Sequence, residues 1–210
     1  EAQVEEYARR LYARWKDRNP VVRATILGSP GQVELHLSTR ASNLRKAEDS
    51  LDLAVEELVG VLGRDVYTTE GLPLEHVVGN SLRSRGWRIA LAESCTGGLL
   101  ASRLTDIPGS SAYLDLAVVT YSNLEKINLL GIPASLIETH GAVSEFVALA
   151  MASGVATRAK ADIGVGVTGI AGPTGGTNSK PVGTVFVAVA GVGGERVKEF
   201  AFRGERDMVK

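Results

Sequence analysis

The first residue suited to chemistry is a serine in a short loop between two predicted elements. Ser94 follows an apolar stretch at 88–92, which predicts a buried strand, and precedes a predicted helix over 99–104. A hydroxyl at such a turn is exposed beside the free backbone N–H groups of the helix start, which stabilise an anion or a developing oxyanion. The same residues also fit a simple helix N-cap, because serine and threonine are favoured there. The motif alone leaves both interpretations open.

Cys95, the next residue, is an alternative nucleophile. No neighbour in the sequence would lower the pKa of its thiol, so a small buried packing residue is the favoured interpretation. It is the only cysteine of the chain, so no internal disulfide can form, which fits a reducing compartment.

A lysine near the start of another predicted helix is the candidate base. Asn123 is the predicted N-cap of a helix over 123–130, which follows a predicted strand over 113–120. The positive end of the helix dipole disfavours the protonated form of Lys126, and a partly buried lysine there suits a neutral base for a nearby serine. Most lysines near helix starts are surface charges. Lys126 is singled out because it and Tyr121 follow a strand that we expect to end near Ser94.

Two further segments carry ligand-binding residue types. A glycine-rich stretch at 166–177 follows a predicted strand over 162–168, so its backbone can approach a phosphate or a planar ligand, and Thr168 can hydrogen-bond it. A flexible glycine loop is the alternative, and the spacing excludes a Walker P-loop. Near the end of the chain, Arg203 or Arg206 could hold a phosphate. The three histidines lack metal-ligand spacing, so we expect no metal. They are His36, His76 and His140.

The elements that position these residues predict an α/β fold in the C-terminal part. Apolar runs predict strands at 88–92, 113–120, 162–168, 183–190 and 196–202, and helical spacing predicts helices at 74–85, 99–104, 123–130 and 143–158. At least five strands with interleaved helices indicate a mostly parallel or mixed sheet covered on both faces, a three-layer α/β/α domain.

The first seventy residues predict a separate, small α+β domain. A helix with apolar residues at three- and four-residue steps ends at Asn19 and Pro20, two strands at 21–27 and 32–37 form a hairpin, a helix covers 44–58, and 66–67 is a short closing strand. The order is α-β-β-α-β. A linker at 68–73 divides the chain into domains 1–70 and 71–210.

Composition narrows the class of protein. The chain is 44% hydrophobic and 22% charged, with a net charge of −1, which is typical of a soluble globular protein and provides no global field for nucleic acid or anionic lipid. No apolar run is long enough to span a membrane, and no signal segment begins the sequence. We therefore expect a cytoplasmic protein with no membrane partner.

Several of these motifs, in this order, resemble the CinA C-terminal domain family. The resemblance runs from Leu72 to the end and is carried by the segments 92–98, 121–123 with Lys126, 130–131, 141–144 and 168–173. That family is known as nicotinamide-nucleotide amidohydrolase, or NMN deamidase, which converts nicotinamide mononucleotide and water into nicotinate mononucleotide and ammonia in pyridine nucleotide salvage.

The resemblance implies a role for each candidate residue. Ser94 would attack the carboxamide carbon, Lys126 would take the serine proton and help deliver one to the leaving ammonia, and Tyr121 would orient or relay. Thr168 would bind the substrate and Arg206 its phosphate, with no cofactor. The candidate oxyanion donors are backbone N–H groups of Thr96, Gly97, Gly98 and Gly169. Whether Ser94 forms a covalent intermediate or holds a water for direct attack stays open.

The resemblance also has implications for the rest of the protein. The first seventy residues are similar to the KH-like linking domain of CinA proteins, and relatives suggest a homodimer. We expect the chain to be a fragment that lacks the N-terminal domain associated with ADP-ribose pyrophosphatase activity and that stops inside the final helix.

The sequence offers two alternative functions. The same glycines would serve a non-catalytic nucleotide-binding or regulatory module of the larger pyrophosphatase-linked protein. An RNA-binding role for the first seventy residues is disfavoured, because they hold ten basic and twelve acidic side chains. The segment 28–31 has the Gly-x-x-Gly spacing of a nucleic-acid clamp but joins two strands rather than two helices. We expect a structural or dimer-arranging role and no nucleic acid.

Overall fold

The computed structural model describes residues 2–29 and 31–210, which form two compact units. They are Glu1–Leu74 and Glu75–Lys210. No helix among the described residues is both long enough and apolar enough to cross a membrane.

The first unit is a hairpin packed against two helices. Its elements are α1 (Ala2–Lys16), β1 (Val22–Ser29), β2 (Gln32–Thr39), α2 (Leu44–Leu62) and the 3₁₀ turn η1 (Gly63–Asp65). The two strands pair antiparallel, as predicted. Ala8, Leu11 and Trp15 recur along one face of α1 and are buried in a core with Ala54 and Leu58 of α2.

The predicted closing strand at 66–67 is wrong. The described part of this unit has a two-stranded sheet, and η1 is followed by chain without strand pairing. Two residues offer too few ladder hydrogen bonds to hold a third strand unless the rest of the fold places them there. The order is therefore α-β-β-α, and a KH-like fold is not shown.

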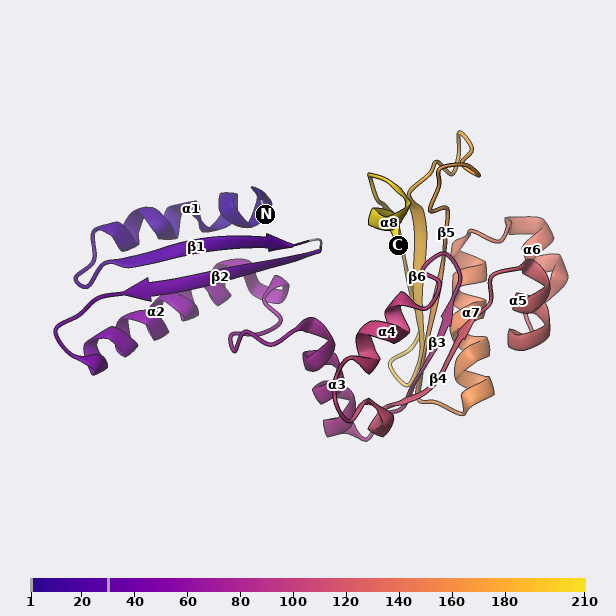
Figure 1. Ribbon diagram of the computed structural model, residues 1–210, viewed down its shortest axis with the longest axis horizontal. Coiled ribbons are helices and arrows are strands. Elements are labelled where there is room, and N and C mark those ends of the chain that lie inside the picture. The colour runs from indigo at the N-terminus through magenta and orange to yellow at the C-terminus, as the bar shows by residue number, and fades with distance from the viewer. Residues whose placement is uncertain (1, 30) are drawn as a thin grey trace. The chain divides into compact units, whose positions relative to one another are not determined.

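The second unit is a five-stranded mixed sheet between two layers of helices (Figure 1). The strand order is β4-β3-β5-β6-β7, with β3 parallel to β4 and β5 and the last two strands antiparallel. The strands are β3 (Ile89–Glu93), β4 (Leu114–Val119), β5 (Ile163–Gly169), β6 (Thr184–Gly191) and β7 (Arg196–Ala201). The helices are α3 (Leu74–Arg85), α4 (Leu99–Thr105), η2 (Ser110–Ala112), α5 (Asn123–Leu130), α6 (Ala134–His140), α7 (Glu145–Ala159) and α8 (Arg206–Val209).

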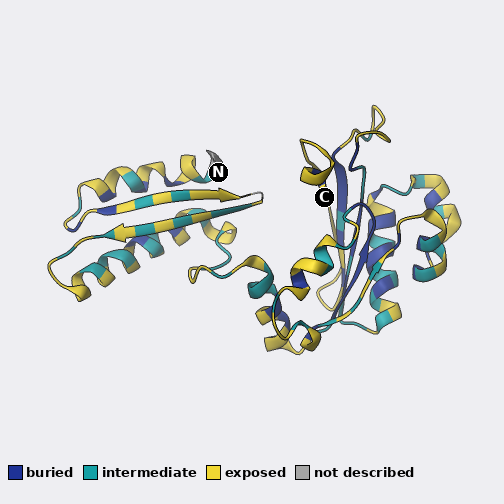
Figure 2. Cartoon of the chain, viewed as in Figure 1, coloured by how far each residue is buried: buried dark blue, intermediate teal, exposed yellow. Residues whose placement is uncertain are grey.

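The central strand β3 separates two cores. All five of its residues are buried, as Figure 2 shows in dark blue. Because side chains alternate along a strand, Ala90 and Ala92 pack with the core of α5, α6 and α7, whereas Ile89 and Leu91 pack with that of α3 and α4. The predicted α/β class with helices on both faces is confirmed, and the sheet is mixed.

The topology decides where a site can form. Strands β3, β4 and β5 are parallel neighbours, so their carboxyl ends lie at the same edge of the sheet. The loops that follow them are the three that carry the chemistry-bearing residues of the sequence. In open α/β sheets this edge is where ligands bind.

Candidate active site

Ser94 lies in the turn between β3 and α4. Its N–H donates to the Val167 carbonyl at 3.0 Å, which holds the turn against β5. Gly97 and Gly98 have φ values of +63° and +100°, a left-handed backbone that a side chain would strain. The two glycines therefore let the chain pass directly from the strand into the helix.

Lys126 lies in α5, the helix that follows β4, and its side chain reaches Ser94 at the end of the neighbouring strand β3. Its Nζ lies 3.1 Å from Ser94 Oγ, 2.8 Å from the Thr120 carbonyl and 3.3 Å from that of Tyr121. The helix that carries it is capped by Ser122, whose hydroxyl accepts from the Glu125 N–H; the predicted cap, Asn123, is the first helical residue instead. Serine and asparagine both cap helices well, so the sequence could not distinguish two adjacent ones.

The lysine is buried without a counter-charge. Its side chain is 1% exposed, and among the described residues no carboxylate lies within ion-pair distance of it. Burial lowers the pKa of the Lys126 amine, and a Cys95 thiolate would partly oppose this shift. The environment therefore favours the neutral amine, the form that can accept a proton.

A cavity of about 200 Å³ connects most of the candidate residues. Ser94, Tyr121, Lys126, Thr168, Gly169 and Arg206 all line it, with Cys95, Asn123, Ala142, Val143 and Ala171. The edge of the sheet thus brings together residues that are more than a hundred positions apart. The spacing did not single out Asn123 as a site residue, because its place before a helix suggested only a cap.

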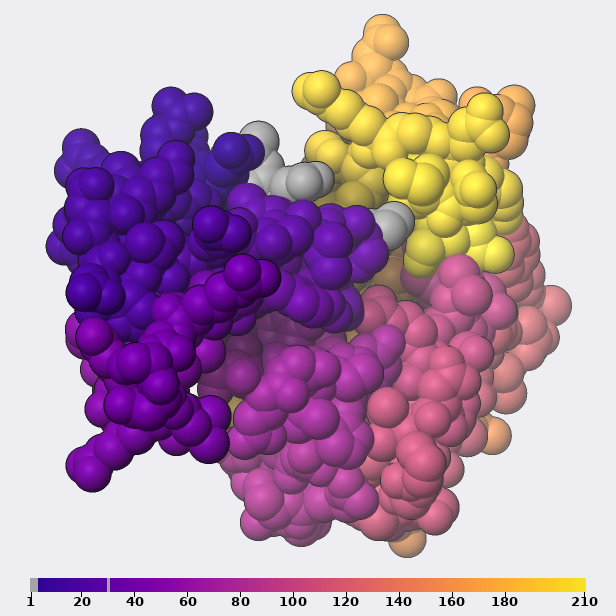
Figure 3. All heavy atoms as spheres, turned by 60° about the vertical axis from the view of Figure 1, so that its left-hand side comes forward, coloured from indigo at the N-terminus to yellow at the C-terminus, as the bar shows by residue number. Residues whose placement is uncertain are grey.

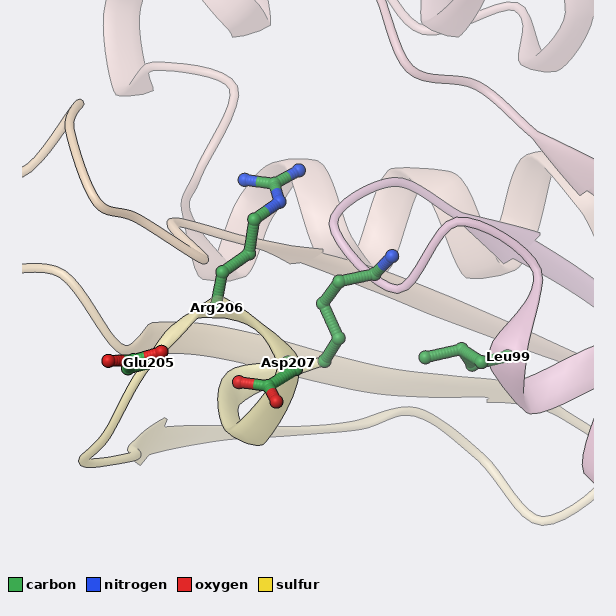
Figure 4. A pocket seen from close by; sticks show the side chains of 5 residues that line it. Leu99, Glu205, Arg206 and Asp207 are labelled. Carbon is green, nitrogen blue, oxygen red and sulfur yellow. The ribbon is translucent and has the colours of Figure 1, made fainter.

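A second hollow, of about 440 Å³, lies beside the start of α4 (Figure 4). It is lined by Leu99, Glu205, Arg206, Asp207 and Lys210. Figure 3 shows the C-terminal segment, in yellow, at the surface of the second unit. This hollow holds no nucleophile paired with a base. The smaller cavity is therefore the candidate active site, although the second hollow is larger.

Two of the predicted oxyanion donors are engaged elsewhere. The Gly98 N–H donates to Glu93 Oε2 at 2.9 Å, and the Gly97 N–H donates to the Ser94 carbonyl at 3.2 Å. Both assignments are therefore corrected. In the described turn no oxygen accepts from the N–H of Thr96, which remains a candidate, or from that of Cys95, a further candidate that the sequence did not indicate. The N–H of Gly169 stays a prediction.

Cys95 is buried, as the sequence interpretation favoured. It is 6% exposed and packs with Val167 and Ala171. Burial raises the pKa of its thiol, an effect partly offset by the N–H groups of Cys95 and Thr96. The thiol is therefore held protonated, and Ser94 is the better placed nucleophile.

Thr168 and Arg206 each face the cavity with part of their hydrogen-bonding capacity already used. The Thr168 hydroxyl donates to the Ala142 carbonyl at 2.8 Å, which leaves its lone pairs as acceptors. Arg206 donates from Nη1 to the Gly172 carbonyl at 2.7 Å and from Nη2 to the Tyr121 hydroxyl at 2.9 Å. A guanidinium has five N–H donors, so three remain.

Arg206 is held above the site by these two bonds. Its guanidinium points away from the carboxylates of Glu205 and Asp207 (Figure 4). The Tyr121 hydroxyl accepts a hydrogen bond from Arg206, whereas the backbone carbonyl of Tyr121 accepts one from Lys126. A proton relay through the phenol therefore stays a prediction.

Comparison with known proteins gives a consistent result. A family model described as the CinA C-terminal domain matches residues 72–210. A CinA-like protein of Koribacter versatilis is 45% identical over all of this chain and 50% of its own length. A putative competence-damage inducible protein of Halothermothrix orenii is 45% identical over 87% of this chain and 44% of its own length. The chain thus spans half or less of these relatives.

Solved structures agree with the sequence matches. The competence/damage inducible protein CihA from Agrobacterium tumefaciens has a TM-score of 0.63 and 41% identity over 65% of this chain and 84% of its own. A CinA superfamily protein from Escherichia coli has a TM-score of 0.63 and 32% identity over 70% of this chain and 89% of its own.

Proposed function

This chain belongs to the CinA family, and from that premise we propose that its second unit is a nicotinamide-nucleotide amidohydrolase. The reaction converts nicotinamide mononucleotide and water into nicotinate mononucleotide and ammonia. The observation that carries the proposal is the 3.1 Å approach of Lys126 Nζ to Ser94 Oγ beside the cavity. The family resemblance supplies the substrate.

The hydrogen bonds of the lysine favour proton transfer from the serine. A neutral amine has two N–H groups and one lone pair. The carbonyls of Thr120 and Tyr121 accept the two hydrogens. In the neutral amine the lone pair is then left for Ser94 Oγ, and the serine hydroxyl can donate to it. This is the arrangement that a general base requires.

The covalent route uses this pair twice. Lys126 takes the Ser94 proton as Oγ bonds to the carboxamide carbon, and the developing oxyanion is stabilised by the N–H groups of Cys95 and Thr96. The C–N bond then breaks, and the lysine returns the proton to the leaving ammonia. A water deprotonated by the same amine then attacks the resulting ester, the Oγ–C bond breaks, and the lysine returns that proton to Ser94 Oγ as nicotinate mononucleotide leaves. In the alternative route, Ser94 holds that water for direct attack.

Two other side chains suit the two ends of the substrate. The lone pairs of Thr168 can accept from the carboxamide N–H, since its own hydrogen is committed to Ala142. The three remaining N–H donors of Arg206 suit a phosphate. No metal or cofactor has a part in these steps.

Ammonia release from nicotinamide mononucleotide is the decisive experiment. We expect Ser94→Ala and Lys126→Ala each to lower kcat by at least about a hundredfold, because each removes one half of the nucleophile-base pair. Ser135→Ala, on the exposed side of α6, is the matched control and should keep full activity. Circular dichroism checks that each variant is folded.

A wild-type chain that binds the nucleotide but releases no ammonia would contradict the proposal. It would favour the alternative, a nucleotide-binding or regulatory module. Near-normal turnover in either alanine variant would remove that residue from its assigned role.

A further inference from the structure

Glu93 is a buried carboxylate that the proposed reaction does not use. It is the last residue of β3, directly before Ser94, and is 1% exposed. It does not line the cavity. A buried charge is costly unless hydrogen bonds replace its water, so its partners show what the carboxylate does.

Those partners are the N–H groups of Gly98, the N-cap of α4, and of Leu100 and Ala101 in its first turn. Oε2 accepts from Gly98 at 2.9 Å and from Leu100 at 3.2 Å, and Oε1 accepts from Ala101 at 2.8 Å. Helix N-termini leave these N–H groups without helical partners and carry a partial positive charge, which an ionised carboxylate neutralises. A carboxylate can satisfy all three at once because both oxygens are acceptors.

The three hydrogen bonds to Glu93 close a loop of chain that contains the nucleophile, Ser94. The chain leaves Glu93, passes through 94–98 and returns to the same side chain. Ser94 and the two candidate oxyanion donors lie inside this closed segment. With these N–H groups at the start of α4 occupied, they are unavailable to the substrate phosphate.

The backbone of the same residue supports the base. The Glu93 carbonyl accepts from the Thr120 N–H at 2.8 Å, and the Thr120 carbonyl accepts from Lys126 Nζ at 2.8 Å. Glu93 therefore fixes the serine turn through its side chain and the lysine anchor through its main chain.

We infer that Glu93 is a positioning residue of the active site, whose carboxylate holds the 94–98 turn so that Ser94 Oγ and its oxyanion donors face the cavity. The inference rests on the proposed function. Glu93→Gln keeps the shape but replaces one accepting oxygen with an NH₂ group, which opposes a backbone donor. Glu138→Gln, on an exposed part of α6, is the matched control.

Two rates test the inference in the full chain. The first is kcat for nicotinamide mononucleotide, with KM measured alongside. The second is the rate at which methanesulfonyl fluoride sulfonylates Ser94, forming an S–O bond and releasing fluoride, followed by mass spectrometry. This second rate reports serine reactivity without the nucleotide.

We expect Glu93→Gln to lower both rates by about tenfold to a hundredfold, with KM changed less than about threefold, and Glu138→Gln to match the wild type. A merely structural role would lower the melting temperature and leave both rates per folded molecule unchanged, which would overturn the inference. If Glu93→Gln does not fold, Glu93→Asp keeps the charge and shortens the reach; wild-type rates in that variant would also overturn it.

The outcomes separate the two proposals. A wild type that reacts with the sulfonyl fluoride but releases no ammonia contradicts the proposed substrate, and slower labelling of Glu93→Gln would still support the positioning role. A wild type that does neither contradicts both proposals.

Discussion

At the scale of single residues, the site depends on an amine kept out of water. Lys126 gains hydrogen bonds to two carbonyls but has no carboxylate partner within ion-pair distance among the described residues. Neutral acceptors satisfy its hydrogens without stabilising a full positive charge as a carboxylate would. Burial therefore disfavours the charged ammonium form of Lys126 and favours the neutral amine, which can act as a base.

The direction of this pKa shift predicts the pH dependence of the reaction. Lys126 must be neutral to accept the serine proton, so kcat/KM rises with pH as the amine deprotonates and then reaches a plateau. Since burial lowers the pKa from its ordinary value of 10.5, the midpoint of this rise lies below pH 10.5. Initial rates of ammonia release across pH measure it. A midpoint at or above 10.5 would contradict the base role.

Arg206 provides a test of phosphate recognition. Arg206→Ala should lower kcat/KM for nicotinamide mononucleotide by about tenfold to a hundredfold, the worth of a charge-assisted hydrogen bond. Nicotinamide riboside, which lacks the phosphate, should lose much less. Arg196→Ala is the control, because this exposed arginine of β7 does not line the cavity. Equal losses of kcat/KM with both substrates would show that Arg206 only holds together the loops that carry Gly172 and Tyr121.

At the scale of elements, close packing of helix on strand sets the position of β5. A Cβ on Gly164 would overlap the Ala152 carbonyl of α7, and one on Gly166 would overlap that of Ala148. These strand glycines let the helix lie directly on the sheet. The Thr168 and Gly169 end of β5 is thereby fixed relative to the β3 turn.

Gly166→Ala should therefore destabilise the second unit. Because its methyl group meets helix backbone rather than a movable side chain, we expect a loss of about 1–3 kcal/mol in the free energy of unfolding. Gly193→Ala is the control, since nothing lies within 4 Å of its added Cβ, and should change stability by less than about 0.5 kcal/mol. Urea denaturation of both variants measures the difference; equal stabilities would contradict this account.

The sequence predicted elements better than contacts. The sequence predicted all five strands of the second unit to within one residue at each end. For the central strand β3, burial of every residue leaves a continuous hydrophobic signal. The seven-residue helix α6 was missed, since it is too short to show a period. The engagement of the Gly98 N–H was also missed, because a side chain five residues away accepts it and spacing does not show where that side chain turns.

At the scale of the whole molecule, the residues of the site belong to one of the two units. Every residue that lines the candidate cavity lies between Ser94 and Arg206, inside Glu75–Lys210. The first unit has its own core of Trp15, Leu58 and their neighbours. The residues that line the candidate cavity therefore all come from the second unit.

We therefore expect the segment 72–210 alone to release ammonia with a kcat within about twofold of the whole chain, since an independent unit keeps its own core. Parallel assays of the two proteins, with circular dichroism of the shorter one, would check this. A folded but inactive segment would show that the first unit contributes to the site.

The strand order has a consequence for the protein during its synthesis. β3 pairs with β4 and with β5, and the residues Ile89 and Ile163 of the latter pair are separated by most of the second unit. While the ribosome is still producing the intervening helices, one edge of an apolar strand has no partner. Unpaired strand edges promote association between chains. The interval before β5 emerges is thus the time at which a nascent chain most needs a chaperone.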